Sequence, residues 1–94
     1  MIKVLIERNI AEGLEAPYEA AARKVLQKAI HSPGYLSGES YADMEHPNRR
    51  FVMVTWQNRY SWERWEHSAA RKQCLETFAP MLMEEEKITM LEPL

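Results

Sequence analysis

The amino-acid sequence predicts an α+β domain whose strands and helical regions follow the order β-α-β-β-α-β. Short segments rich in β-branched residues alternate with two longer segments in which apolar residues recur every three or four positions. Turn-forming residues separate these segments. Nothing within residues 1–94 has the composition of a linker, so we expect the chain to form one domain.

The first strand is expected over residues 2–10, where Arg8 shares a face with two apolar residues at alternate positions. A helix follows from Pro17, which suits the first helical turn because its missing N–H needs no partner there. Three- and four-residue spacing of apolar side chains extends this helix to about His31. The segment Ser32–Gly34 then ends it.

Residues 35–43 and 51–56 are expected to form the second and third strands, joined as a hairpin. The third strand carries apolar side chains on both faces, with Phe51 and Met53 on one of them. A sheet with one face in water would show alternation instead. We therefore expect a second copy of the chain to cover the outer face in a symmetric dimer.

A second helical region is predicted from about Ser61, with a fresh start capped by Ser68 and an end or a kink at Pro80. The acidic run Glu84–Glu86 is interpreted as a solvated helix end. Residues 87–91 complete the pattern as a fourth strand. This order is that of the ferredoxin-like fold.

Composition limits the partners and the compartment. Lysine and arginine number 12 against 14 aspartate and glutamate residues, and the formal net charge is -2, so we expect no binding to nucleic acid. Cys74 is the only cysteine, which fits a reducing cytoplasm. No apolar stretch approaches the ~20 residues that span a bilayer, so no membrane association is expected.

Several short motifs, taken in order, resemble the antibiotic biosynthesis monooxygenase family. They are Ser32–Tyr35 before the second strand, Arg50–Val52 opening the third, Trp56 closing it, and Trp65 and His67–Ser68 in the following helical region. The resemblance implies a homodimer, a dimeric α+β barrel with a pocket between the sheet and helices of each subunit. The family includes oxygenases that use no metal or flavin, haem-degrading enzymes and members of unknown activity.

In the cofactor-independent oxygenases an aromatic substrate is deprotonated and passes electrons to oxygen, so the protein must supply a base and oxyanion donors. His67 is the candidate base, with a surface or helix-cap residue as the alternative. Arg8 is the second catalytic candidate; it either reaches the pocket or pairs with an acid. Trp65, Tyr41 and Trp62 are the candidate substrate contacts, with packing or sheet-edge roles as alternatives.

No metal or other cofactor is expected. The three histidines share no metal-ligand spacing. The haem-degrading branch uses an axial histidine where this chain has Leu75, and a first-strand asparagine where it has Arg8. Haem is therefore not expected either.

The sequence thus favours a small-molecule oxidoreductase, a monooxygenase without metal or flavin that acts on an aromatic or quinol-like compound. The alternative is a ligand-binding or stress-associated dimer without turnover. A haem-binding or haem-degrading protein ranks third.

Overall fold

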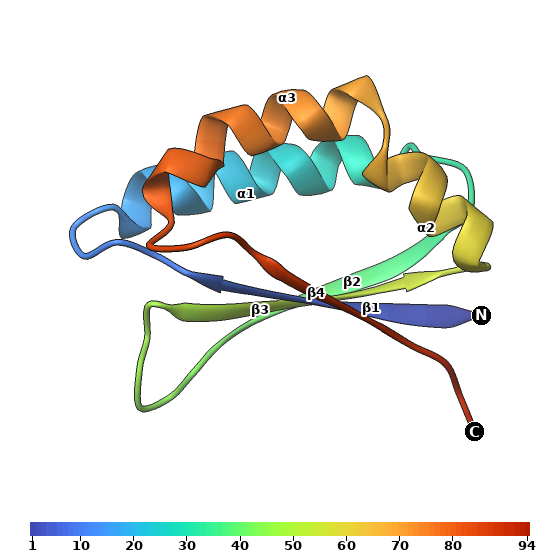
Figure 1. Ribbon diagram of the computed structural model, residues 1–94, viewed down its shortest axis with the longest axis horizontal. Helices are drawn as coiled ribbons and strands as arrows, with labels where there is room; N and C mark the ends of the chain where they lie inside the picture. The colour runs from blue at the N-terminus through green and yellow to red at the C-terminus, as the bar shows by residue number, and fades with distance from the viewer.

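The computed structural model describes every residue from Met1 to Leu94 and has two layers. All helices lie on one face of a single four-stranded sheet, as Figure 1 shows. The elements are β1 (Ile2–Asn9), α1 (Glu15–Ala29), β2 (Tyr35–Ala42), β3 (Arg49–Trp56), α2 (Arg59–Glu66), α3 (Ala69–Phe78), the 3-10 turn η1 (Ala79–Met81) and β4 (Lys87–Leu91).

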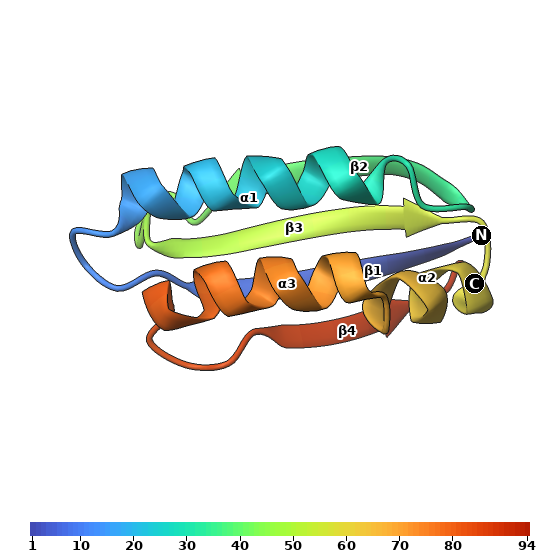
Figure 2. The same cartoon turned by 90° about the horizontal axis from the view of Figure 1, so that it is seen from above.

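The strands lie in the order β2-β3-β1-β4, and every neighbouring pair is antiparallel. Val4 of β1 is paired with Val54 of β3 on one side and with Met90 of β4 on the other. Seen from above, α1 lies over the β2–β3 side of the sheet and α3 over the β1–β4 side (Figure 2). The α+β ferredoxin-like order predicted from the sequence is confirmed.

The second helical region is two helices, and polar side chains explain the division. Asn58 precedes α2, and its side-chain oxygen accepts a hydrogen bond from the Ser61 backbone N–H at 2.9 Å. Ser68 precedes α3 and accepts from the Arg71 N–H at 3.2 Å. Such caps satisfy N–H groups that have no partner within the helix. The predicted fresh start at Ser68 is therefore confirmed, and so is the helix end near Pro80, which lies in η1.

Several element boundaries differ from the sequence-based expectation by one or two residues, among them the start of β3 and the end of α1. β3 begins at Arg49 rather than at residue 51, because Arg49 and Arg50 pair with Asn9 and Arg8 of β1 and so extend the ladder. α1 ends at Ala29, two residues before His31. Neither shift changes which side chains face the helices.

The outer face of the sheet has no helix over it (Figure 1). Leu5 lies opposite Met53 across β1 and β3, and Phe51 lies opposite Tyr41 across β3 and β2. Leu5, Phe51 and Met53 are only half-buried, although apolar side chains usually gain stability from full burial. The predicted apolar character of both faces of β3 is thus present in the fold.

No helix of the chain combines the length and the apolar character that crossing a membrane requires.

Candidate active site

A cavity of about 400 Å³ lies between the sheet and the helices, within the size range of small-molecule sites. Small residues are part of its lining, among them Ala22 of α1 and Gly38 and Ser40 of β2. Its lining comprises Ile6 and Arg8 of β1; Tyr18, Glu19, Ala22, Arg23, Val25, Leu26 and Ala29 of α1; Gly38–Ala42 of β2; Arg50–Val52, Val54 and Trp56 of β3; Trp62 and Trp65 of α2; and Arg71 of α3.

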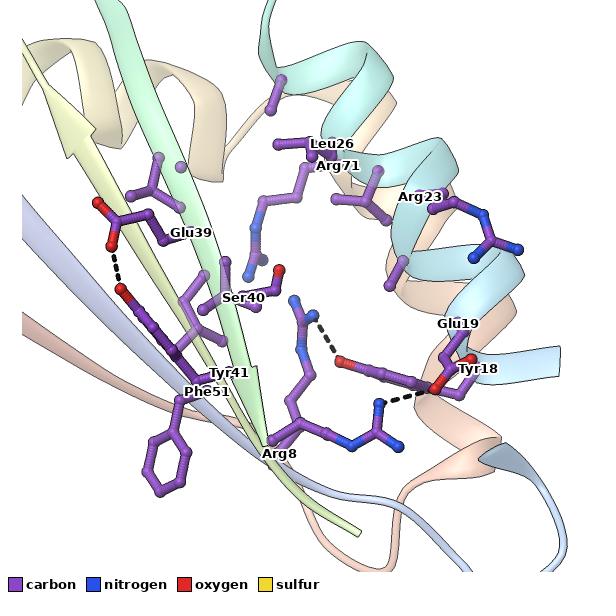
Figure 3. Close-up of a pocket in the computed structure, with 18 of the residues that line it drawn as sticks. Arg8, Tyr18, Glu19, Arg23, Leu26, Glu39, Ser40, Tyr41, Phe51 and Arg71 are labelled. Atoms are coloured by element: carbon purple, nitrogen blue, oxygen red, sulfur yellow. Dashed lines mark hydrogen bonds and ion pairs between the residues drawn. The ribbon is translucent and has the colours of Figure 1, made fainter. Parts of the chain in front are cut away.

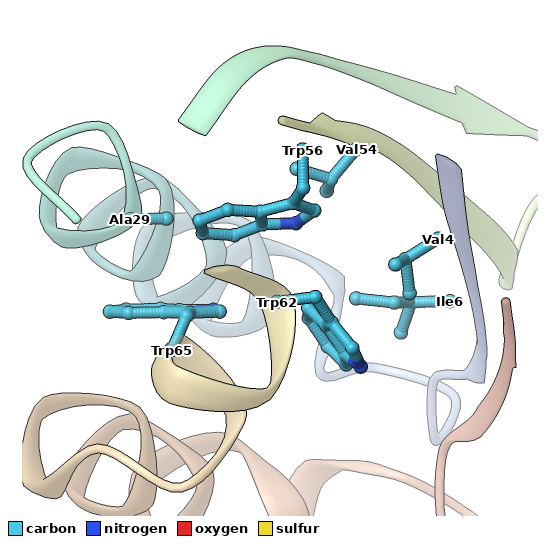
Figure 4. Close-up of a cluster of buried hydrophobic side chains, with 7 residues drawn as sticks. All are labelled: Val4, Ile6, Ala29, Val54, Trp56, Trp62 and Trp65. Carbon is cyan, nitrogen blue, oxygen red and sulfur yellow. The ribbon is translucent and has the colours of Figure 1, made fainter. Parts of the chain in front are cut away.

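One wall of the cavity is aromatic. Trp56 is completely buried, and its ring centroid lies 6.1 Å from that of Trp62 and 6.5 Å from that of Trp65 (Figure 4). The rings of Trp56 and Trp65 are inclined by only 25° and form a stacked pair. The buried indole N–H groups of Trp56 and Trp62 have no hydrogen-bond acceptor in the protein. The three rings are thus packed closely at this end of the cavity, with Trp56, Trp62 and Trp65 only 0%, 1% and 5% exposed.

The opposite end of the cavity carries buried charge. Arg8 donates from Nε to one carboxylate oxygen of Glu86 at 2.9 Å, and Arg71 donates from Nη2 to the other oxygen. The side chains of Arg8, Arg71 and Glu86 are 4%, 5% and 9% exposed. Figure 3 shows the side chains of Arg8 and Arg71 extending into the cavity from β1 and α3.

Two aromatic side chains fix the Arg8 guanidinium. Its Nη1 donates to the hydroxyl of Tyr18 at 3.1 Å, and its central carbon lies 4.3 Å from the ring centroid of Phe78. Arg71 has a similar contact with Trp62, at 5.6 Å. Stacking on aromatic rings suits the planar guanidinium, so both cations are held in place.

The mouth of the cavity is polar. Arg50 of β3 donates to Glu19 of α1 at 3.0 Å. On the outer face of the sheet, beside Phe51 and Met53, the Tyr41 hydroxyl donates to Glu39 on the same strand. That hydrogen bond to a carboxylate is the main reason why the pKa of Tyr41 lies above its ordinary value. Burial raises the pKa of Tyr35, whose ring packs edge-on against Trp56 at 5.6 Å. Both phenols therefore remain neutral near pH 7.

Three of the five residues predicted for the site, Arg8, Trp65 and Trp62, line the cavity with their side chains. The side chain of Tyr41 is 53% exposed and lies on the outer face of the sheet beside Phe51, as the sheet-edge alternative predicted (Figure 3). Both alternatives for Arg8 hold together, because it reaches the cavity and also pairs with an acid. The side chain of His67 is 72% exposed at the end of α2 and is absent from the lining. This placement does not support the expected role of His67 as a general base in the pocket.

Sequence reasoning missed Arg71, Glu86 and Tyr18 as parts of the site. Glu86 was expected in a solvated helix end; it lies instead in the segment before β4, with its carboxylate buried between two arginines. Arg71 lies three residues before Cys74 and seven residues before Phe78, and this helical spacing places it on the buried face of α3. That spacing was a usable signal in the sequence. No group of three or more His, Cys, Asp or Glu side chains is arranged to hold a metal ion.

Residues 1–77 match the family model for antibiotic biosynthesis monooxygenases. The chain therefore belongs to the antibiotic biosynthesis monooxygenase family, which confirms the resemblance seen in the sequence motifs. No curated protein shows a significant sequence match to the chain.

Solved structures of family members have the same fold at low sequence identity. A member from Nitrosomonas europaea is 16% identical with a TM-score of 0.90, covering 100% of this chain and 99% of the other. One from Bordetella bronchiseptica is 16% identical with a TM-score of 0.89, covering 99% and 96%. SnoaB from Streptomyces nogalater, a cofactor-independent oxygenase, is 10% identical with a TM-score of 0.85, covering 98% and 92%.

Proposed function

We propose that the chain, as one domain of a symmetric homodimer, is a monooxygenase that needs neither metal nor flavin and oxidises an aromatic, quinol-like compound. The observation that carries this proposal is a cavity with a tryptophan wall facing two buried arginines. Family membership supports the reaction class, and so does the likeness to an oxygenase described as cofactor-independent.

In this proposal each wall has a separate task. The substrate ring lies against Trp65, while Arg8 and Arg71 donate hydrogen bonds to the oxygen that becomes negative when the substrate loses a proton. The substrate anion then reduces O2. With an anthrone, whose central ring carries a CH2 group, one oxygen atom becomes the new carbonyl and the other leaves as water with the two CH2 hydrogens, so the step balances without another reductant.

The arginines act in this reaction as donors and not as bases, because a guanidinium does not lose its proton in a protein. Apolar side chains make up 14 of the 22 residues that line the cavity. Such a lining strengthens the hydrogen bonds to a developing oxyanion, since few waters compete for the same donors.

The proposed dimer uses the outer face of the sheet. That face presents Leu5, Phe51 and Met53, which no helix covers. A second sheet would bury these side chains and stabilise a small domain whose own core is limited. Sedimentation at micromolar concentration should give twice the mass of the chain; compact monomers would refute the dimer.

Oxygen uptake with a panel of quinols and anthrones, using metal-free protein, tests the reaction. Trp65→Phe should lower kcat/KM by about 2- to 10-fold, because a smaller ring loses stacking area. Tyr60→Phe is the matched aromatic control, since Tyr60 is 63% exposed on the same helix and should leave the rate unchanged. Absence of oxygen uptake above the protein-free rate, across the whole panel, would contradict the proposal.

His67→Ala belongs in the same assay. Because the His67 side chain is mostly exposed and lies outside the lining, we expect little change in rate. A loss of about 100-fold or more would instead restore His67 as the general base.

A ligand-binding dimer without turnover is the second candidate, and one observation favours it. The one buried carboxylate at the charged end, that of Glu86, already accepts hydrogen bonds from two arginines, one on each oxygen, so neither oxygen is directed at a substrate. Mass spectrometry of a quinol recovered after saturating incubation in air separates the two functions. Unchanged quinol supports binding alone, whereas an oxidised product supports the enzyme.

A further inference from the structure

The cavity is closed where β1, α2 and α3 form its walls and open where α1 and β2 do. The lining residues from β1, α2 and α3 are at most 5% exposed. All exposed residues of the lining belong to α1 or to β2. β2 is an edge strand of the sheet, and α1 lies above that side (Figure 2). The opening is therefore a slot between α1 and β2.

Only small residues of β2 face the helices along this slot. Gly38, Ser40 and Ala42 line the cavity at alternate positions of the strand, and Figure 3 shows the Ser40 side chain pointing toward the helices. Between them, Glu39 and Tyr41 direct their side chains to the outer face, because successive strand residues face opposite sides. The β2 side of the slot thus has no long side chain across it.

One ion pair crosses the slot at its arginine end. Arg50 of β3 donates to Glu19 of α1 at 3.0 Å, and it also donates to the backbone oxygen of Pro47 at 2.6 Å. Ala42, Arg50 and Arg8 are direct neighbours across β2, β3 and β1. The pair therefore stands between the open edge of the sheet and Arg8, as Figure 3 shows.

The two partners of this pair are not held equally. The Arg50 side chain is 20% exposed and keeps its hydrogen bond to Pro47 when Glu19 moves away. The Glu19 side chain is 47% exposed and has no second ion pair or side-chain hydrogen bond. An exposed ion pair is weak, because water and salt compete with it. Glu19 can therefore leave the slot while Arg50 stays in place.

We propose that ligands enter the cavity through the slot between α1 and β2, with the Glu19–Arg50 pair as a gate at its arginine end and Ser40 as the residue that sets the width admitted. The inference rests on the proposed function only in that an aromatic ligand occupies the cavity. Entry from the other sides would require the closely packed layers to separate. Through the slot, a flat ring system reaches the tryptophan wall once the weak ion pair opens.

The first test measures how fast two neutral ring systems reach the tryptophan wall. Hydroquinone has one ring and anthrone has three fused rings, and under nitrogen neither is oxidised. Stopped-flow quenching of tryptophan fluorescence gives the association and dissociation rate constants of each.

Glu19→Gln should raise both rate constants of anthrone by about 2- to 5-fold and leave its Kd unchanged, because the variant opens the gate without changing the contacts of the bound ring. Glu63→Gln is the matched control. It removes the same charge from the exposed Arg59–Glu63 pair on α2, outside the lining, and should change neither rate constant.

Salt opens the same gate without a variant. Between about 0.05 M and about 1 M NaCl, both rate constants of anthrone should rise more in the wild type than in Glu19→Gln, because only the wild type has an ion pair to screen. The ratio of the variant's association rate to that of the wild type should therefore fall toward one.

Ser40→Leu tests the width of the slot. The larger side chain should slow the entry of anthrone by about tenfold and that of hydroquinone by about twofold or less, because it fills space that only the wider ring system needs. Ser37→Leu places the same side chain on the opposite face of β2, where Ser37 is paired with Thr55, and should slow neither ring system.

Unchanged rate constants in Glu19→Gln at low salt, or equal slowing of both ring systems by Ser40→Leu, would overturn the inference. A change in Kd without a change in association rate would do so too, since it places these residues against the bound ligand and not on its path. Quenching by neither ring system would also overturn it. Circular dichroism establishes that each variant is folded.

The rate constants are measured without oxygen, so the two proposals fail separately. Gated binding without oxygen uptake from any quinol or anthrone in air would refute the proposed reaction alone. Oxygen uptake together with entry rates that neither Glu19→Gln nor Ser40→Leu changes would refute this inference alone.

Discussion

The two ends of the layer between sheet and helices are equally buried but differ in what their side chains do. At one end Val4 and Trp56 are 0% exposed and pack against apolar neighbours. At the other end the side chains of Arg8 and Arg71 are 4% and 5% exposed and share one carboxylate. Burial alone therefore does not identify the residues that stabilise the fold. Burying an apolar side chain stabilises the folded state, whereas burying a charge costs its hydration, which ion pairs and hydrogen bonds must replace.

The largest expected effect is at the tryptophan end. Trp56→Ala should lower the free energy of unfolding by about 3–5 kcal/mol, because it removes a fully buried ring and leaves a void between β3 and α2. Urea denaturation measures the change. Leu36→Ala is the control, since Leu36 is 52% exposed and its loss should cost about 0.5 kcal/mol or less. Equal losses for the two variants would mean that the buried ring of Trp56 contributes no more to stability than an exposed apolar side chain.

The second-largest expected change in the free energy of unfolding is at a glycine packed against the tryptophan end, compared with a glycine in open space. Gly34 and Gly13 have nearly the same backbone torsion, with φ of 88° and 89°. A methyl group at Gly34 would overlap the side chain of Ser61 at the start of α2, whereas one at Gly13 would meet nothing within 4 Å. Gly13→Ala should therefore cost only the backbone strain, about 1–2 kcal/mol, and Gly34→Ala about 1 kcal/mol more.

The additional cost of Gly34→Ala should disappear in a Ser61→Gly background, where the overlapping side chain is gone. A double-mutant cycle by urea denaturation measures this coupling. If Gly13→Ala proves as costly as Gly34→Ala, backbone strain alone accounts for both, and the turn before β2 is not packed tightly against α2.

Sequence reasoning predicted the tryptophan end better than the arginine end, for a physical reason. The strands, the helices and the Ser68 cap depend on short-range spacing, which the chain displays directly. Arg71 and Glu86 are separated by 15 positions and meet only after β4 pairs with β1. An acidic run is usually solvated, so the local pattern around Glu86 favoured the wrong interpretation. The exposure of His67 depends likewise on where α2 ends, which periodicity does not fix to the residue.

The smallest expected effect is at the arginine end. Arg8→Met should change the free energy of unfolding by about 1 kcal/mol or less, although Arg8 is almost as buried as Trp56. The substitution leaves Arg71 paired with Glu86 and so removes the surplus charge.

Two further contacts of Arg8 set the size of that change. A methionine side chain can still pack on Phe78, as the Arg8 guanidinium does at 4.3 Å. The Tyr18 hydroxyl, which lines the cavity, loses a donor, and so does one carboxylate oxygen of Glu86, whose other oxygen keeps its hydrogen bond from Arg71. Urea denaturation of Arg8→Met beside Trp56→Ala provides the measurement. A loss of unfolding free energy as large as that of Trp56→Ala would mean that the ion pairs of Arg8 and Arg71 with Glu86 stabilise the fold. A small loss would instead favour ligand recognition as the role of the two buried arginines.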